Sequence, residues 1–202
     1  MSKKIAIQGE LGAYSHIAAE NLYAGAEIKT CTTFEETFKQ AYNDQNYKIV
    51  IPIENSLAGR VADIHYLLPK YKLQIHGEYF QTVEHNLLCK QDATIDDIKY
   101  VRSHAQAIGQ CQNIINKRKF KSIVSADTAG SAKELAEGKD KSIAAIASEL
   151  SAKIYNLKIL EKNIEDEKGN VTRFLIMGKK IEQPEFKSCL LYTSDAADDV
   201  EC

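Results

Sequence analysis

The sequence predicts an α/β fold, and three observations favour it. Short apolar runs of strand length alternate with segments that have helical periodicity. Several of the apolar runs end in glycine or in polar side chains, which is typical of a strand that turns into a helix. No internal repeat and no low-complexity linker interrupts this alternation. Strands are predicted at residues 5–8, 49–53, 73–80, 86–89, 100–102, 122–125, 143–146 and 175–178.

Composition narrows the classes of function. The 202 residues can bury the core of one large domain or of two small lobes. The 26 Lys and Arg residues are scattered among 28 Asp and Glu residues and form no basic tract, so the sequence does not indicate a nucleic-acid-binding surface. Met1 leads directly into the first strand without the apolar core of a signal peptide, and no stretch has the length of a membrane span. We therefore expect a cytoplasmic protein with no membrane partner.

The cysteines do not form a site. They are dispersed and odd in number, at Cys31, Cys89, Cys111, Cys189 and Cys202. In a cytoplasmic chain this pattern predicts reduced thiols that mostly fill the core. The sequence also lacks CxxC, HExxH, Walker and GxGxxG motifs, so we expect no metal, no nucleotide and no other cofactor.

The first strand runs into a glycine turn. Residues 9–15 contain Gly9 and Gly12 and precede a helix that extends to Leu22. Such a turn either aims backbone N–H groups at a ligand or only makes a tight connection, and the spacing does not decide between the two. The next helix has a clear start, because Thr33 and Glu36 form a capping box.

Three polar side chains follow the strand at residues 49–53. Glu54, Asn55 and Ser56 lie at the carboxyl end of this strand, where open α/β sheets bind ligands. Asn55 and Ser56 could equally cap the following helix, which is predicted over residues 59–68 and ended by Pro69.

The chain is predicted to cross between lobes near residue 80. Two strand-like stretches, at 73–80 and 86–89, flank an extended connection. His76 and His85 lie in this region, and a lone histidine in such a place is more often structural than catalytic.

Further caps are predicted in the second half of the chain. Ser103 and Gln106 form a capping box, and helical periodicity continues to Ile115. The capping role explains Ser103 fully, whereas Gln106 and Gln110 are one turn apart and can face the same cleft. Asp127 is a plausible cap for a helix that ends at Gly138.

Thr172 and Arg173 form a candidate corner for a small acid. Arg173 can hold a planar carboxylate through a two-pronged hydrogen bond, and the Thr172 hydroxyl can donate to the bound group. The alternative is an ordinary strand threonine beside an arginine in a surface ion pair.

Six motifs in order resemble those of a known family. They lie at residues 9–15, 52–56 with Gly59, 85–88, 103–106 with Gln110 and Cys111, 127–129, and 170–174. Together they resemble the catalytic domain of the prephenate dehydratase family over roughly residues 4–181. Ala105 and Glu10 stand where the family usually has proline, and neither change removes a functional side chain.

This resemblance implies a fold and an activity. The expected fold is two α/β lobes similar to type II periplasmic binding proteins, with the active-site cleft between the lobes. One lobe would comprise about residues 1–76 with 164–181, and the other about 77–163. The implied reaction converts prephenate to phenylpyruvate in L-phenylalanine biosynthesis, without a cofactor, and the resemblance is compatible with a homodimer.

The resemblance also implies roles for individual residues. The implied catalytic residues are Thr172, Glu54, Asn55, Ser103 and Gln110. The implied substrate-binding residues are Arg173, Phe174, Ser56, Gly12, Ser15, His104 and Gln106. Thr172 would donate to the leaving hydroxyl, and Arg173 would hold a carboxylate.

The end of the sequence departs from the family pattern. Residues 182–188 would begin the linker to an ACT domain, which the chain lacks, and residues 189–202 resemble a translated sequencing adapter. Three other functions remain open: an arogenate dehydratase, a non-catalytic protein that binds a small carboxylate, and a folded but inactive fragment.

Overall fold

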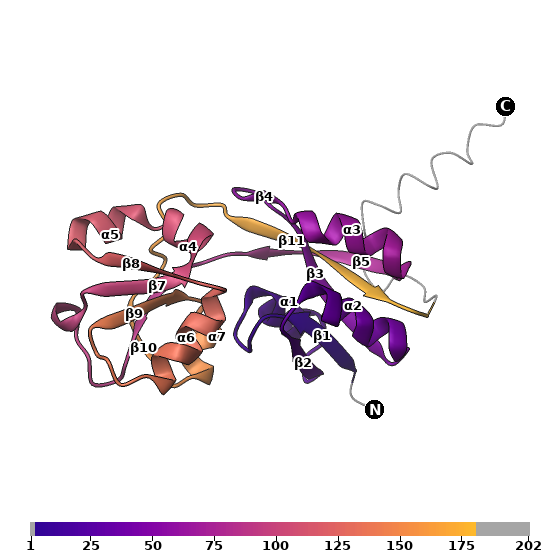
Figure 1. Cartoon of the computed structure of the whole chain (residues 1–202), viewed down its shortest axis with the longest axis horizontal. Helices are drawn as coiled ribbons and strands as arrows, with labels where there is room; N and C mark the ends of the chain where they lie inside the picture. Colours follow the sequence, from indigo (N-terminus) through magenta and orange to yellow (C-terminus); the bar gives the residue numbers. More distant parts are fainter. Residues whose placement is uncertain (1–2, 181–202) are drawn as a thin grey trace.

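The computed structural model describes residues 3–180 and divides them into two lobes. Each lobe is built on one mixed sheet flanked by helices, and the lobes lie next to each other along the long axis of the molecule (Figure 1). The expected two-lobed α/β fold is confirmed. The predicted linker start and tail, with Cys189 and Cys202, lie outside the described residues.

The first lobe contains the N-terminal elements and the last strand. Its sheet has the order β2-β1-β3-β11-β5, with β4 paired to β3. β1 is parallel to β2 and β3, whereas β11 runs antiparallel to β3 and β5. The strands are β1 (Lys4–Gln8), β2 (Glu27–Cys31), β3 (Tyr47–Asn55), β4 (Gly59–Arg60), β5 (Gln74–Thr82) and β11 (Val171–Gly178). The helices are α1 (Tyr14–Leu22), α2 (Phe34–Asn43) and α3 (Ala62–Tyr71).

The second lobe is formed by the middle of the chain. Its sheet has the order β10-β6-β9-β7-β8, in which β7 is parallel to β8 and β9, and β6 is antiparallel to β9 and β10. The strands are β6 (Asn86–Cys89), β7 (Tyr100–His104), β8 (Lys121–Ser125), β9 (Ile143–Ala147) and β10 (Lys158–Glu161). The helical segments are η1 (Ile95–Asp97), α4 (Ala105–Gly109), α5 (Gln112–Arg118), α6 (Thr128–Glu137) and α7 (Glu149–Ile154).

The chain crosses between the sheets twice. β5 belongs to the first sheet as far as Thr82, so the outward crossing lies later in the chain than the division expected at residues 76 and 77. Ile164 packs in the core of the second lobe, so the return to β11 also comes later than expected. Both crossings pass between the lobes, which places their residues at the boundary (Figure 1).

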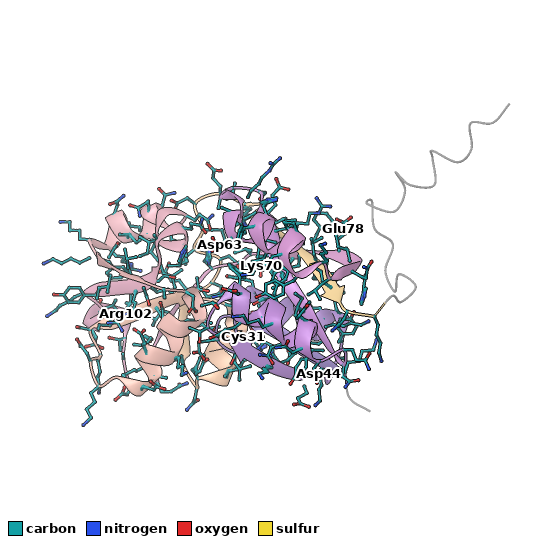
Figure 2. All side chains as sticks on the ribbon, turned by 45° about the vertical axis from the view of Figure 1, so that its right-hand side comes forward. Cys31, Asp44, Asp63, Lys70, Glu78 and Arg102 are labelled. Carbon is teal, nitrogen blue, oxygen red and sulfur yellow. The ribbon has the colours of Figure 1, made fainter. Side chains whose placement is uncertain are left out.

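Each sheet separates two apolar cores because successive strand residues point to opposite faces. In β3, Ile49 and Ile51 pack with α2 and α3, whereas Val50 packs with Ile5 and Ile7 beneath α1. The three cysteines of the described chain, Cys31, Cys89 and Cys111, are free and buried in these cores. Charged side chains cover the outer surfaces of both lobes (Figure 2).

Two predicted helix starts are confirmed by the hydrogen bonds at their first turns. The Thr33 hydroxyl accepts a hydrogen bond from the Glu36 backbone, and the Asp127 carboxylate accepts one from the Gly130 backbone. These caps satisfy backbone donors that would otherwise lack a partner at a helix start. Gly138 ends α6 as expected.

Two predicted helices have different bounds in the structure. α3 begins at Ala62, after the β4 strand, and continues through Pro69 to Tyr71. A proline in the last turn removes only one backbone donor, so the helix does not end there. The helix predicted through Ile115 is broken between α4 and α5, and at the break both carboxylate oxygens of Asp166 accept the backbone N–H groups of Gln112 and Asn113.

Among residues 3–180, no helix is long and apolar enough to cross a bilayer.

Candidate active site

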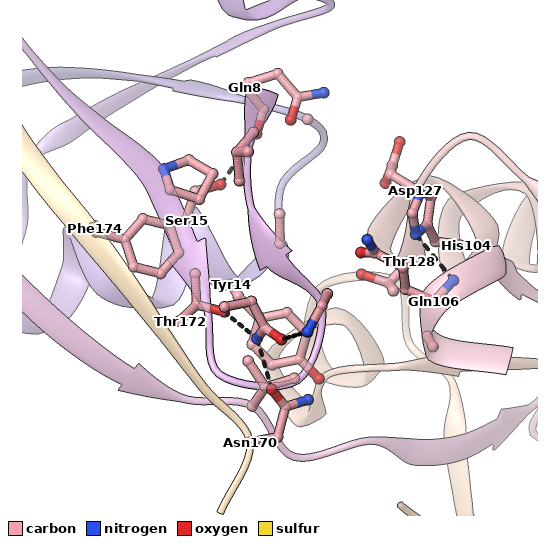
Figure 3. Close-up of a pocket in the computed structure, with 18 of the residues that line it drawn as sticks. Gln8, Tyr14, Ser15, His104, Gln106, Asp127, Thr128, Asn170, Thr172 and Phe174 are labelled. Carbon is pink, nitrogen blue, oxygen red and sulfur yellow. Dashed lines mark hydrogen bonds between the residues drawn. The ribbon is translucent and has the colours of Figure 1, made fainter. Parts of the chain in front are cut away.

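A cavity of about 520 Å³ lies between the two lobes. The first lobe contributes the turn before α1, the end of β3 and the start of β11, and the second lobe contributes α4 and the start of α6. Figure 3 shows Tyr14, Asn170 and Thr172 on one side of this space, with His104, Asp127 and Thr128 across from them. Polar groups from distant parts of the sequence therefore meet at the boundary between the lobes.

Seven of the twelve predicted site residues line this cavity. They are Ser15, Asn55, His104, Gln106, Gln110, Thr172 and Phe174. Thr172 and Phe174 face it together because they are two residues apart in β11. The structure thus brings together residues that are separated by more than half of the chain.

Asn55 and Thr172 are directly bonded. The Asn55 side-chain Nδ2 donates to Thr172 Oγ1 at 2.9 Å, and it also donates to Asn170 Oδ1 at 2.6 Å. The Asn55 Oδ1 accepts two backbone N–H groups, from Leu57 at 3.0 Å and Ala58 at 2.8 Å. Asn55 therefore holds the turn after β3 and the Thr172 hydroxyl at the same time.

The hydrogen bonds continue from Asn170 to the second lobe. Asn170 Nδ2 donates to Gln110 Oε1 at 2.9 Å, and Gln110 Oε1 lies 2.9 Å from His85 Nε2. His85 Nδ1 lies 3.1 Å from the Tyr14 hydroxyl, which donates to the Glu84 carbonyl at 2.6 Å. A continuous chain of polar contacts thus joins α1, both crossings, α4 and the β3–β11 pair.

Burial is the main cause of the pKa shifts of His85 and Tyr14 in this series of polar contacts. Burial lowers the pKa of His85, although its hydrogen bond to Gln110 and the nearby Glu165 act in the opposite direction. Burial also raises the pKa of Tyr14 well above its usual range, and Cys111, Glu165 and Glu84 act in the same direction. Both side chains are therefore neutral near pH 7.

Three helices begin at the cavity. Ala13, which precedes the first turn of α1, provides no side-chain cap, and Ala13, Tyr14 and Ser15 all line the cavity. His104 is the N-cap of α4, where its Nδ1 accepts from the Gln106 backbone, and Asp127 is the N-cap of α6, where its carboxylate accepts from the Gly130 backbone. A helix start carries partial positive charge, so the uncapped first turn of α1 favours an anionic ligand, whereas side chains already occupy the starts of α4 and α6.

Arg60 adds a full positive charge at the edge of the cavity. Among the described residues that line the cavity, it is the only Lys or Arg, and it lies in the short strand β4. Two acidic residues, Asp63 and Asp127, line the cavity as well. The cavity therefore offers both a cationic and an anionic partner to a bound molecule.

Arg173 does not line the cavity. It points to the face of β11 opposite to Thr172, where its Nε donates to the Glu78 carboxylate at 2.6 Å and its guanidinium lies over the Phe80 ring. The Glu78 side chain is only 3% exposed, and Arg173 gives its buried carboxylate a cationic partner. The carboxylate clamp that we expected at Arg173 does not fit this geometry.

Ser103 and Ser56 also lie outside the cavity lining. The Ser103 hydroxyl is fully buried and donates to the Ile146 carbonyl at 2.7 Å, and the cap of α4 is His104 instead. Ser103 belongs to β7, and its hydroxyl is taken up by the backbone of the neighbouring strand β9 instead of the first turn of α4. Ser56 accepts the Val171 backbone N–H at 3.0 Å and thereby holds the start of β11.

Glu54 and Gly12 complete the predicted residues that do not line the cavity. Glu54 is exposed, and its backbone pairs with Arg173 of β11 on one side and Arg60 of β4 on the other. It directly precedes Asn55, which faces the cavity. The Gly12 carbonyl accepts hydrogen bonds from the Ser148 and Ser151 hydroxyls of the second lobe at 2.6 and 3.1 Å. Gly12 thus fastens one lobe to the other.

Sequence reasoning missed three members of the hydrogen-bonded chain. Asn170 lies in the motif that contains Thr172, so its position could have suggested a role. His85 was favoured as a structural residue, and Tyr14 was read only as part of a turn. Both lie within the motifs at residues 9–15 and 85–88, but their hydrogen-bond partners are far away in the sequence, so the motifs alone give them no role.

The described residues 3–180 contain no group of three or more His, Cys, Asp or Glu side chains that could hold a metal ion.

Comparisons with known proteins agree on one family. The prephenate dehydratase family profile matches residues 5–182. An Arabidopsis thaliana arogenate dehydratase/prephenate dehydratase is 40% identical over 177 residues, which are 88% of this chain and 46% of that protein. A bifunctional N-acyl-homoserine lactone acylase/prephenate dehydratase from Komagataeibacter europaeus is 40% identical over 176 residues, covering 87% of this chain and 63% of that protein.

A solved structure shows the same arrangement. The prephenate dehydratase of Arthrobacter aurescens in complex with L-Phe superimposes with a TM-score of 0.82 at 25% identity, covering 91% of this chain and 63% of the other. The chain spans about half to two thirds of the length of these relatives.

Proposed function

The chain belongs to the prephenate dehydratase family, and we propose that it converts prephenate to phenylpyruvate in the cavity between its lobes. The reaction is that of a lyase and serves the biosynthesis of L-phenylalanine. The proposal requires no cofactor and places the protein in the cytoplasm.

The bond between Asn55 and Thr172 carries this proposal. Because Asn55 Nδ2 donates to Thr172 Oγ1, the threonine oxygen acts as the acceptor and its own proton remains free. Thr172 lines the cavity and is only 9% exposed, so this proton can be donated to a molecule bound there. An oriented hydroxyl of this kind can donate to a group on which negative charge develops.

The reaction needs such a donor. In prephenate, the bond between the ring and its carboxylate breaks, and the electron pair enters the ring as the C–O bond to the ring hydroxyl breaks. Carbon dioxide leaves, and the departing hydroxide takes up one proton to become water. The product ring is aromatic, so the reaction is downhill and the protein has mainly to orient the substrate and stabilise the leaving hydroxide. Thr172 donates its hydrogen bond to that hydroxide.

Two features of the cavity suit the two carboxylates of prephenate. The uncapped first turn of α1 presents backbone N–H groups, and Arg60 provides a guanidinium that can bind a carboxylate through two hydrogen bonds. In this proposal Arg60 takes the role that the sequence had suggested for Arg173. Gln110, Gln106 and His104 surround the remainder of the substrate.

Arogenate is a second candidate substrate, and one observation favours it. Asp63 and Asp127 line the cavity, and either carboxylate could receive the ammonium group that arogenate carries in place of the keto group of prephenate. The dehydration chemistry at Thr172 would be the same for both substrates.

A direct assay tests the proposal. The purified protein is incubated with prephenate, and phenylpyruvate is followed by its ultraviolet absorbance; in a parallel reaction arogenate is supplied and phenylalanine is measured. Turnover of prephenate supports the proposal, and exclusive turnover of arogenate assigns the second substrate. A folded protein that binds either compound without turnover would refute the enzymatic function in favour of carboxylate binding.

A further inference from the structure

His85 has an unusual position for a buried histidine. It lies on the outward crossing between β5 and β6, it is only 3% exposed, and it also lines the cavity. Its two ring nitrogens face different lobes, since Nδ1 lies near Tyr14 of α1 and Nε2 lies near Gln110 beyond α4. What this histidine does depends on which nitrogen carries the proton.

The direction of the hydrogen bonds that lead to His85 is fixed at Asn55, the far end of this series of bonded side chains. Asn55 Oδ1 accepts from the backbone N–H groups of Leu57 and Ala58. A backbone N–H can only donate, so the Asn55 oxygen must face these two groups and its Nδ2 must face Asn170. The Asn55 amide is therefore held in one orientation.

This orientation is transmitted from one amide to the next. Asn170 receives the Asn55 donor at its Oδ1, so its Nδ2 must point to Gln110. Gln110 then receives that donor at Oε1, and the same oxygen lies 2.9 Å from His85 Nε2. Two acceptors cannot bond to each other, so His85 Nε2 must carry a proton.

The surroundings of the other nitrogen are compatible with this assignment. In the neutral ring Nδ1 accepts from the Tyr14 hydroxyl, which shares its proton with the Glu84 carbonyl. Tyr14 contacts the ring and Glu165 acts on it, while Glu84 and Cys111 act on Tyr14, and Asp166 acts on Cys111. If the ring gained a second proton, it would be placed on Nδ1, and the bond from Nε2 to Gln110 would remain.

We propose that His85 is a positioning residue that acts through Gln110. Its Nε2–H and Asn170 Nδ2 together hold Gln110 Oε1, which turns the Gln110 Nε2 group toward the cavity. The Gln110 Nε2 carries two N–H bonds, and no other described residue accepts a hydrogen bond from them. They can therefore donate to the substrate. Thr172 O–H and Gln110 N–H then both face the cavity as side-chain donors to a substrate rich in oxygen.

This inference rests on the proposed function, and a matched pair of variants tests it. Gln and Met have side chains of similar length, but only Gln keeps a donor for Gln110. His85→Met should raise the KM for prephenate about fivefold, the effect of losing one neutral hydrogen bond, with kcat within about twofold of the wild type. His85→Gln should restore most of the lost affinity.

A second buried histidine provides the control. His76 is only 2% exposed and bonds to the Lys180 carbonyl, away from the cavity. His76→Met should lower Tm and leave KM unchanged. If His85 were purely structural, His85→Met would also lower Tm and the fraction of active protein while leaving KM at the wild-type value. That result would overturn the proposal.

The tautomer provides a readout that does not depend on activity. Nitrogen-15 NMR of the labelled protein near pH 7.5 should show His85 protonated at Nε2 and unprotonated at Nδ1. The opposite tautomer would overturn the inference even if the protein converts prephenate. If neither prephenate nor arogenate is converted, the proposed function fails, and the NMR result still decides whether His85 orients Gln110.

Discussion

Asn55 donates a 2.9 Å hydrogen bond to Thr172 from the neighbouring strand of the same sheet. The donor comes from the carboxyl end of β3, and the acceptor comes from β11, which returns to the first lobe after the chain has built the second. This bond assigns the acceptor role to the threonine oxygen and leaves the hydroxyl proton for the cavity.

Removing the hydroxyl of Thr172 should therefore abolish most of the activity. We expect Thr172→Val, which has a similar shape, to lower kcat by about 100-fold or more, as when one oriented donor to a developing anion is lost. Thr172→Ser keeps the hydroxyl and should retain much of kcat. Initial rates of phenylpyruvate formation, with circular dichroism as the test of folding, measure both. A folded Thr172→Val protein with a normal rate would remove Thr172 from the mechanism.

Arg60 should contribute to substrate binding. Arg60→Gln should raise the KM for prephenate about tenfold or more with a smaller change in kcat, because a guanidinium–carboxylate pair is lost from both the ground state and the transition state. Arg102 serves as the matched control, since it pairs with Glu134 on the surface of the second lobe (Figure 2). Arg102→Gln should leave KM unchanged, and equal effects of the two variants would contradict the assignment.

Arg173 should contribute to stability instead of substrate binding. Arg173→Met leaves the buried Glu78 carboxylate without its guanidinium partner, which should cost about 3 kcal/mol of unfolding free energy. The double variant Arg173→Met with Glu78→Leu should recover part of this loss. Urea unfolding measures the stability of both variants. A raised KM at unchanged stability would instead support a carboxylate-binding role for Arg173.

Gly12 should be intolerant of a side chain. A Cβ at this position would lie 2.4 Å from Ser151 Oγ and 2.8 Å from Ser151 Cα, which belongs to the backbone of the other lobe. Gly25 also has a positive φ but faces open space, so Gly25→Ala reports backbone strain alone. Gly12→Ala should lower Tm more than Gly25→Ala and should also raise KM. Equal Tm values would show that the contact between the lobes adapts easily.

Acid should destabilise the protein through two buried histidines. Burial lowers the pKa of both His16 and His85 below the usual value, although Glu20 and Glu165, respectively, act in the opposite direction. The unfolded chain then binds more protons, so unfolding free energy is lost as the pH falls from about 6.5 toward the folded-state pKa values. Urea unfolding at a series of pH values should show this loss, and His16→Gln combined with His85→Gln should reduce it. A pH-independent stability in this range would contradict the prediction.

The sequence predicted those features that depend on neighbouring residues. The caps at Thr33 and Asp127 were recognisable because a cap and its backbone donors are three residues apart. The strands were recognisable from their apolar runs, and the ordered motifs indicated the family. The two-lobed fold followed from that resemblance and not from periodicity.

The side chains that build the site could not all be placed in this way. Asp166 accepts the backbone N–H groups of Gln112 and Asn113 at the start of α5 from more than fifty residues away in the sequence, so the break between α4 and α5 had no local signal. The sequence also could not show that the Ser103 hydroxyl bonds to the Ile146 carbonyl or that Arg173 pairs with Glu78.

The sequence by itself therefore determined the α/β class, the helix starts at Thr33 and Asp127, and the family of this protein. Only the tertiary structure decided which polar side chains of each motif face the cavity, and that His85, Asn170 and Tyr14 join them. The physical reason is that local structure depends on backbone bonds within a few residues. Side-chain direction at the site depends instead on strand register and on partners from the other lobe.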